Sequence, residues 1–277
     1  MAHELRSARL SNGLTLQYAT QGDPAGTPVV FLHGVTDSWR SFEPVLPHLP
    51  DSVRAFAVTQ RGHGDSDRPM AGYRARDFAA DVGAFLDAVG VETAVVVGQS
   101  MGGTNAIRFA LDRPARTRGL VLVASFASFR RSAAAVEFND TAVRNLTDPI
   151  DVHLAREFQL GTLARPIPRS FFDAVVAETM KVPARVWRAS FDAMLDDECT
   201  DELSAVRVPT LVLSGGQDAF SDSANQRALV AAIPGTHRIE YEAAGHALHW
   251  EAPADFAADL LAFVESLKEE PSPALQP

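Results

Sequence analysis

Residues 94–103 read Ala94-Val95-Val96-Val97-Gly98-Gln99-Ser100-Met101-Gly102-Gly103, and a segment with helical character follows at 104–111. An apolar strand, a sharp Gly-x-Ser-x-Gly turn and a helix form the context in which this motif presents a nucleophile. Glycines fit positions 98 and 102 because side chains there would clash with backbone, while the turn strains the serine. The Ser100 hydroxyl would then lie at a helix N-terminus, which favours developing negative charge. A tightly packed turn without chemistry is the plainer alternative.

Short apolar runs alternate with helix-period segments along most of the chain. Continuous apolar runs occupy residues 29–32, 53–58, 94–97, 119–123 and 210–213, and residues 14–20 alternate apolar with polar. Continuous runs are typical of parallel strands that are covered on both faces, and alternation favours an early antiparallel strand. Helical spacing appears at Phe78, Val82, Phe85, Leu86 and Val89, before Gly90. The pattern predicts an α/β fold built from strand–helix–strand units.

One segment breaks this alternation. Residues 126–206 show helical periods and no convincing strand, as at Trp187, Phe191, Met194 and Leu195. We expect residues 1–125 and 207–277 to form the core domain and residues 126–206 to form a helical cap. Open α/β sheets bind ligands at the carboxyl edge of their strands, so the cap would roof the site. A packing subdomain without influence on selectivity is the alternative.

A serine nucleophile needs a base and an orienting acid. His246 follows a predicted last strand at 237–241, and Asp218 ends the loop that follows the strand at 210–213. Both positions fall at the same edge of the sheet as Ser100. The chain order Ser100, Asp218, His246 is therefore the predicted catalytic triad. Asp222 is a second carboxylate close to this position, but its sequence context is more typical of a helix N-cap.

The reaction also needs backbone N–H groups that bind a developing oxyanion. Met101 follows the nucleophile directly, and Val35 lies in the turn after His33-Gly34. These two amides are the predicted oxyanion hole. The position of His33 in this turn indicates that it holds the loop by hydrogen bonds.

Taken together, these residues resemble the α/β-hydrolase superfamily, in its serine-nucleophile, capped, esterase- or lactonase-like branch. The matching parts are His33-Gly34, Arg61-Gly62-His63-Gly64-Asp65-Ser66, the turn at 98–103, Asp218 and Gly245-His246. The resemblance implies an eight-stranded, mostly parallel sheet, a helical cap after strand six and an acyl-enzyme route. Serine in place of aspartate at position 100 disfavours haloalkane dehalogenases and epoxide hydrolases. Gln60 stands where many relatives carry aspartate, which weakens a loop anchor.

The function favoured by these features is hydrolysis of a carboxylic ester or lactone of a small, hydrophobic molecule. Expected substrate-binding residues are Gly34, Phe126, Trp187, Phe191 and Met194, and neither a metal nor a cofactor is expected. Perhydrolysis, cofactor-free haloperoxidation and C–C bond hydrolysis on the same triad stay open. A small-ligand sensor that retains the hydrolase machinery is the alternative from another class.

The composition limits the partners and the cellular compartment that we expect. The chain has 277 residues, a net charge of −10, 46% hydrophobic residues and one cysteine. Such acidity disfavours a nucleic-acid partner, and a single cysteine excludes an internal disulfide framework. The N-terminus lacks a signal-peptide pattern and no apolar run reaches the length of a membrane span. We expect a cytoplasmic protein without a membrane partner, as a monomer or a homodimer.

Overall fold

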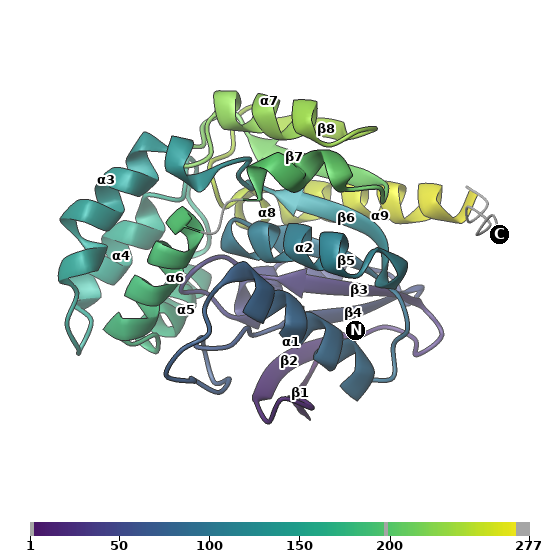
Figure 1. Ribbon diagram of the computed structural model, residues 1–277, viewed down its shortest axis with the longest axis horizontal. Coiled ribbons are helices and arrows are strands. Elements are labelled where there is room, and N and C mark those ends of the chain that lie inside the picture. The colour runs from purple at the N-terminus through teal and green to yellow at the C-terminus, as the bar shows by residue number, and fades with distance from the viewer. Residues whose placement is uncertain (1–2, 197–198, 270–277) are drawn as a thin grey trace.

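The fold is built on one twisted sheet, seen in a computed structural model that describes residues 3–196 and 199–269 (Figure 1). Its eight strands lie in the order β1-β2-β4-β3-β5-β6-β7-β8. β2 runs antiparallel to β1 and β4, and the remaining neighbours are parallel. The strands are β1 Glu4–Arg9, β2 Thr15–Gln21, β3 Thr27–Leu32, β4 Val53–Val58, β5 Ala94–Gln99, β6 Thr117–Val123, β7 Thr210–Gly215 and β8 His237–Tyr241. The predicted α/β fold with a mostly parallel sheet is confirmed.

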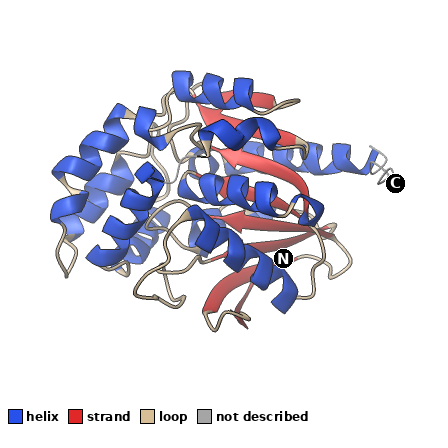
Figure 2. Ribbon diagram, in the orientation of Figure 1, coloured by secondary structure: helices blue, strands red, loops and turns tan. Residues whose placement is uncertain are grey.

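Helices surround this sheet and gather beside it (Figure 2). They are α1 Ala75–Ala88, α2 Met101–Asp112, α3 Ala133–Thr141, α4 Val152–Leu160, α5 Arg169–Met180, α6 Ala184–Asp196, α7 Ser223–Ala232, α8 Leu248–Glu251 and α9 Pro253–Glu269. The predicted end of α1 is confirmed, since Gly90 follows its last turn with φ of 67°. Glycine adopts this backbone conformation without the steric cost that other residues bear. Within the described ranges, no helix is long and apolar enough to cross a membrane.

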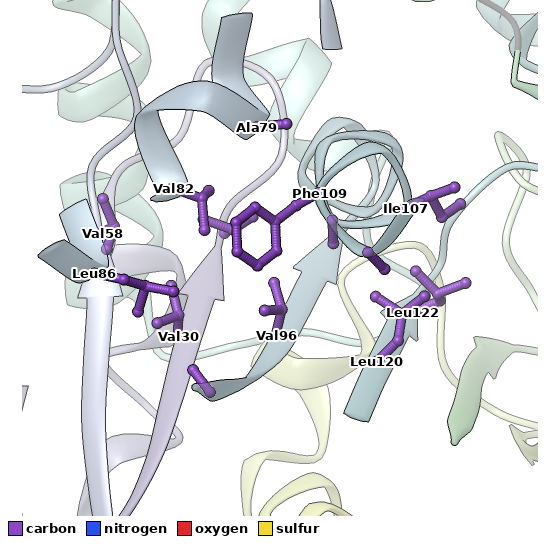
Figure 3. Packing of buried hydrophobic residues seen from close by; sticks show 14 of the residues in the cluster. Val30, Val58, Ala79, Val82, Leu86, Val96, Ile107, Phe109, Leu120 and Leu122 are labelled. Atoms are coloured by element: carbon purple, nitrogen blue, oxygen red, sulfur yellow. The ribbon is translucent and has the colours of Figure 1, made fainter. Parts of the chain in front are cut away.

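Two apolar layers hold the helices to the sheet. Val30 and Val96 point to one face, where they pack against Val82 of α1 and Phe109 of α2 (Figure 3). Alternate residues of the same strands, such as Phe31, belong to a second cluster that includes α8 and α9. Because successive side chains of a strand point to opposite faces, strands covered on both sides must be apolar throughout. This double coverage explains the uninterrupted apolar runs.

The segment between β6 and β7 contains helices α3 to α6, which lie together at one end of the sheet (Figure 1). We call residues 126–206 the helical insertion. Its buried side chains, among them Trp187 and Phe191, form an apolar cluster that also takes in Val35 and Met101 from the sheet's loops. The insertion therefore packs over the ends of β3 and β5, where the predicted site residues lie.

Candidate active site

The turn between β5 and α2 has the strained geometry that its sequence predicts. Ser100 has φ of 52° and ψ of −118°, a conformation that non-glycine residues rarely adopt. A Cβ atom on Gly98 would lie 2.2 Å from the carbonyl oxygen of Gly102, and one on Gly102 would lie 2.1 Å from that of Leu32. The backbone is thus packed so closely that it holds Ser100 in place. Its side chain emerges at the first turn of α2.

The imidazole of His246 is held by Asp218, as the sequence predicts. Nδ1 of His246 lies 2.9 Å from Oδ2 of Asp218, on the loops after β8 and β7. Oδ1 of Asp218 accepts hydrogen bonds from the backbone N–H groups of Phe220 and Ser221, at 2.8 and 2.9 Å. An ionised carboxylate can only accept, so Nδ1 carries the proton and Nε2 is the basic nitrogen. This arrangement allows His246 to take a proton from a nearby hydroxyl.

Ser100 and His246 line one small cavity beneath the helical insertion. Its volume is about 20 Å³, which is enough for roughly one water molecule. The wall consists of Gly34, Val35, Asp37, Gln99, Ser100, Phe158, Gln159, Thr162, His246, Ala247 and Trp250. The cavity brings loops from the ends of β3, β5 and β8 together with the insertion. A substrate larger than water must displace some of these side chains to enter.

The two residues of the predicted oxyanion hole, Val35 and Met101, belong to one apolar cluster at this end of the sheet. Val35 borders the cavity, and Met101 is the first residue of α2, whose N–H has no partner within the helix. Among the described residues, neither amide donates a hydrogen bond. Free N–H groups beside a serine hydroxyl can bind an oxyanion. The oxyanion hole at Val35 and Met101 stays a prediction.

His33 and Gln60 fix the loop that carries Val35. Nδ1 of His33 lies 2.7 Å from the carbonyl oxygen of Gly34, and its Nε2 accepts from the N–H of Gln60. The side chain of Gln60 donates to the carbonyl of His33 at 2.7 Å and accepts from Asn105 of α2 at 2.8 Å. The structural role predicted for His33 agrees with these bonds. Gln60 anchors this loop through two hydrogen bonds, contrary to the expectation of a weakened anchor.

The predicted substrate-binding residues divide into two groups. Gly34 lines the cavity, and the ring of Phe126 lies 6.0 Å from the imidazole of His246. Trp187, Phe191 and Met194 do not line it; they are packed inside the helical insertion. The period of a helix marks its buried face, and that face can meet other helices as well as a ligand. The three residues therefore lie behind the cavity wall rather than in it.

Several cavity residues escaped sequence reasoning. Asp37, Gln159 and Trp250 belong to the wall, although no motif or period singles them out. Asp37 follows the His33-Gly34 turn closely, and this position after a strand that ends at the site is the one available signal. Burial raises the pKa of the Asp37 carboxyl to about 7.

Comparisons with known proteins agree on one family. Residues 27–253 match the family model described as alpha/beta hydrolase fold. The chain is 28% identical to the AB hydrolase superfamily protein YisY of Bacillus subtilis, over 82% of this chain and 87% of the relative. It is 28% identical to a non-heme chloroperoxidase of Streptomyces lividans, over 92% and 98%. The solved structure of the esterase RhEst1 from Rhodococcus is similar with a TM-score of 0.82 and 29% identity, over 95% of this chain and 99% of that chain.

Proposed function

Because the chain belongs to the alpha/beta hydrolase fold family, we propose that it is a serine hydrolase of small carboxylic esters or lactones. Ser100 attacks the ester carbonyl while His246 takes its proton and then passes it to the leaving alcohol. Asp218 orients the imidazole and stabilises its charge, and the amides of Val35 and Met101 bind the oxyanion. Water, activated by His246, then releases the acid from Ser100.

The observation that carries this proposal is the shared cavity of Ser100 and His246, with the carboxylate of Asp218 holding the far side of the imidazole. Apolar rings flank the base, since Phe220 lies 5.4 Å from the imidazole and Phe126 lies 6.0 Å from it. These rings favour a substrate with apolar groups near the reacting carbonyl. The similar esterase from Rhodococcus points to the same substrate class.

The test is turnover of p-nitrophenyl acetate by the purified protein and by Ser100→Ala. We expect a loss of at least about a thousandfold in the variant, because a missing nucleophile leaves only binding and the oxyanion hole. Ser7→Ala, on the exposed strand β1, is the matched control and should keep the wild-type rate. A fluorophosphonate should also add its phosphonyl group to Ser100, with loss of fluoride. Wild-type turnover by Ser100→Ala would refute the proposal.

A second candidate is perhydrolysis or haloperoxidation on the same triad. The similarity to the chloroperoxidase of Streptomyces lividans over nearly both chains favours it. In this reaction hydrogen peroxide replaces water as the acceptor of the acyl group on Ser100. Comparing water, hydrogen peroxide and methanol as acceptors for one acyl donor separates the two candidates. Faster acyl transfer to peroxide than to water at equal concentration supports the second.

A further inference from the structure

A carboxyl group that the proposed reaction does not use lies in the wall of the cavity. Asp37, in the loop after β3, is 6% exposed and borders the same space as Ser100 and His246. A buried carboxyl is costly unless it is hydrogen-bonded. Asp37 therefore needs hydrogen-bond donors to stabilise it in this position.

Hydrogen bonds from two sides support this carboxyl. Nε2 of Gln159, in the helical insertion, donates to Oδ1 of Asp37 at 3.0 Å and to Thr179 at 2.8 Å. The hydroxyl of Ser41 donates to Oδ2 at 3.2 Å and in turn lies 3.0 Å from Nε2 of His249. Each carboxylate oxygen can accept about two hydrogen bonds. Asp37 thus keeps accepting capacity on both oxygens, and it lines the cavity.

Charged neighbours act on Asp37 from several elements. A positive charge on His246, on the loop after β8, lowers the pKa of Asp37 whenever that imidazole takes a second proton, whereas the charge of Glu178 of α5 raises it. Glu178 is itself paired with Lys181 at 2.9 Å and with Arg40 at 3.6 Å, so these cations balance it. The charge of the cavity wall is therefore set mainly by Asp37.

We propose that Asp37 is a specificity-determining residue, which accepts a hydrogen bond from an O–H or N–H group on the acyl part of the substrate and rejects a carboxylate there. The inference rests on the proposed function. The acyl group becomes bonded to Ser100 and stays bonded until water releases it, so it is the part of the substrate that lies beside Asp37 once side chains of the wall have moved to admit it. A second carboxylate beside Asp37 would meet like charge with little water to screen it.

Four methyl esters of similar size test this proposal. They are methyl butanoate, methyl 3-hydroxypropanoate, β-alanine methyl ester and monomethyl malonate, with methanol release as the readout. We expect the hydroxyl and ammonium esters to have higher kcat/KM than butanoate, and malonate to have a kcat/KM lower by on the order of tenfold or more. The discrimination against malonate should increase as pH rises through 7, because ionisation of Asp37 adds the repelling charge.

Variants distinguish a direct contact between Asp37 and the substrate from a long-range effect of charge on the substrate. Asp37→Asn keeps the shape of the side chain and should bring the malonate to butanoate ratio about tenfold closer to one. Asp37→Ser makes the same charge change if the first variant fails to fold. Glu178→Gln removes a neighbouring charge that does not line the cavity, and Asp51→Asn removes an exposed one at the opposite end of β4. Both controls should keep the discrimination against malonate.

Two results would overturn the inference: equal kcat/KM for butanoate and malonate in the wild type, or wild-type ratios in Asp37→Asn. A shift in Glu178→Gln as large as that in Asp37→Asn would also overturn it, because it would assign the effect to long-range charge. The proposed function fails separately. If Ser100→Ala hydrolyses methyl butanoate at the wild-type rate, the proposed reaction is wrong. If Ser100→Ala is inactive and Asp37→Asn keeps the wild-type ratio of malonate to butanoate kcat/KM, only the proposed role of Asp37 is wrong.

Discussion

Replacing Asp37 by Asn should make the folded protein more stable in mild alkali, because the native carboxyl ionises at a cost. Burial raises its pKa from 3.8 to about 7. Between these values the native state keeps a proton that the unfolded chain has released, so this carboxyl lowers stability as pH rises. Above pH 7 both states are ionised and the penalty is constant. The amide of Asn has no charge to desolvate and can keep one acceptor for Gln159.

The size of the effect follows from the shift. One pKa unit corresponds to about 1.4 kcal/mol, so the full penalty is about 4 kcal/mol. Between pH 5 and pH 8 the stability of Asp37→Asn relative to wild type should rise by about 2 to 3 kcal/mol. Buried His63 and His249, whose pKa values fall to about 4 and about 3, lower stability in acid in both proteins. The difference between the two proteins therefore isolates Asp37.

Urea unfolding at pH 5, 6, 7 and 8, followed by circular dichroism, measures this difference. Asp51→Asn is the control, because an exposed carboxyl should show no such trend. Parallel pH curves for wild type and Asp37→Asn would refute the reasoning, since they would mean that the buried carboxyl ionises at no cost. A variant that loses stability from pH 5 to pH 8 relative to wild type would refute it as well.

Three further predictions concern the framework of the site. Gly98→Ala should lower the free energy of unfolding by about 1 to 3 kcal/mol or more, because its Cβ would meet backbone atoms. Gly83→Ala, inside α1, should raise the free energy of unfolding by about 0.5 to 1 kcal/mol. Thermal melts of the two variants measure both effects. Arg61→Ala should cost about 3 to 5 kcal/mol in urea unfolding, since the buried carboxylate of Asp81 loses its paired cation and keeps the amide of Asn12 as a neutral partner. Glu251→Gln should cost about 1 to 3 kcal/mol and lower kcat, because Glu251 accepts the N–H of the residue before the base at 3.1 Å; unchanged melts and kinetics would contradict this role.

The sheet and the positions of Ser100, Asp218 and His246 at one of its edges could be predicted from the sequence, because both leave local patterns along the chain. The run 94–97 is apolar because β5 is covered on both faces, and the glycines beside Ser100 are fixed by backbone contacts of 2.1 to 2.2 Å. Strand β1 left no such mark, since most of its side chains are exposed and pairing with β2 alone defines it. The sequence of β1 therefore has the polar pattern that is typical of a loop, although the segment forms a strand.

The cavity wall was harder to predict because it depends on how the helical insertion sits. Phe158 and Gln159 are neighbours on α4, and both reach the site, whereas Trp187 and Phe191 on α6 pack inside the insertion. A helical period reports which face is buried and not which element buries it. Which element covers that buried face depends on residues far apart in the sequence, so a local pattern does not indicate it.

The insertion leaves the sheet after β6 and returns at β7, which are adjacent strands, so a chimera could exchange residues 126–206 without changing the order of the strands. Such a transplant would still affect the loop that carries His246, the predicted base. The carbonyl of Thr162 accepts the N–H of Ala247 at 3.0 Å, and the N–H of Ala164 donates to Glu251 at 3.0 Å. A donor segment must reproduce these two backbone ties, and library designs that vary the insertion should hold residues 162–164 constant.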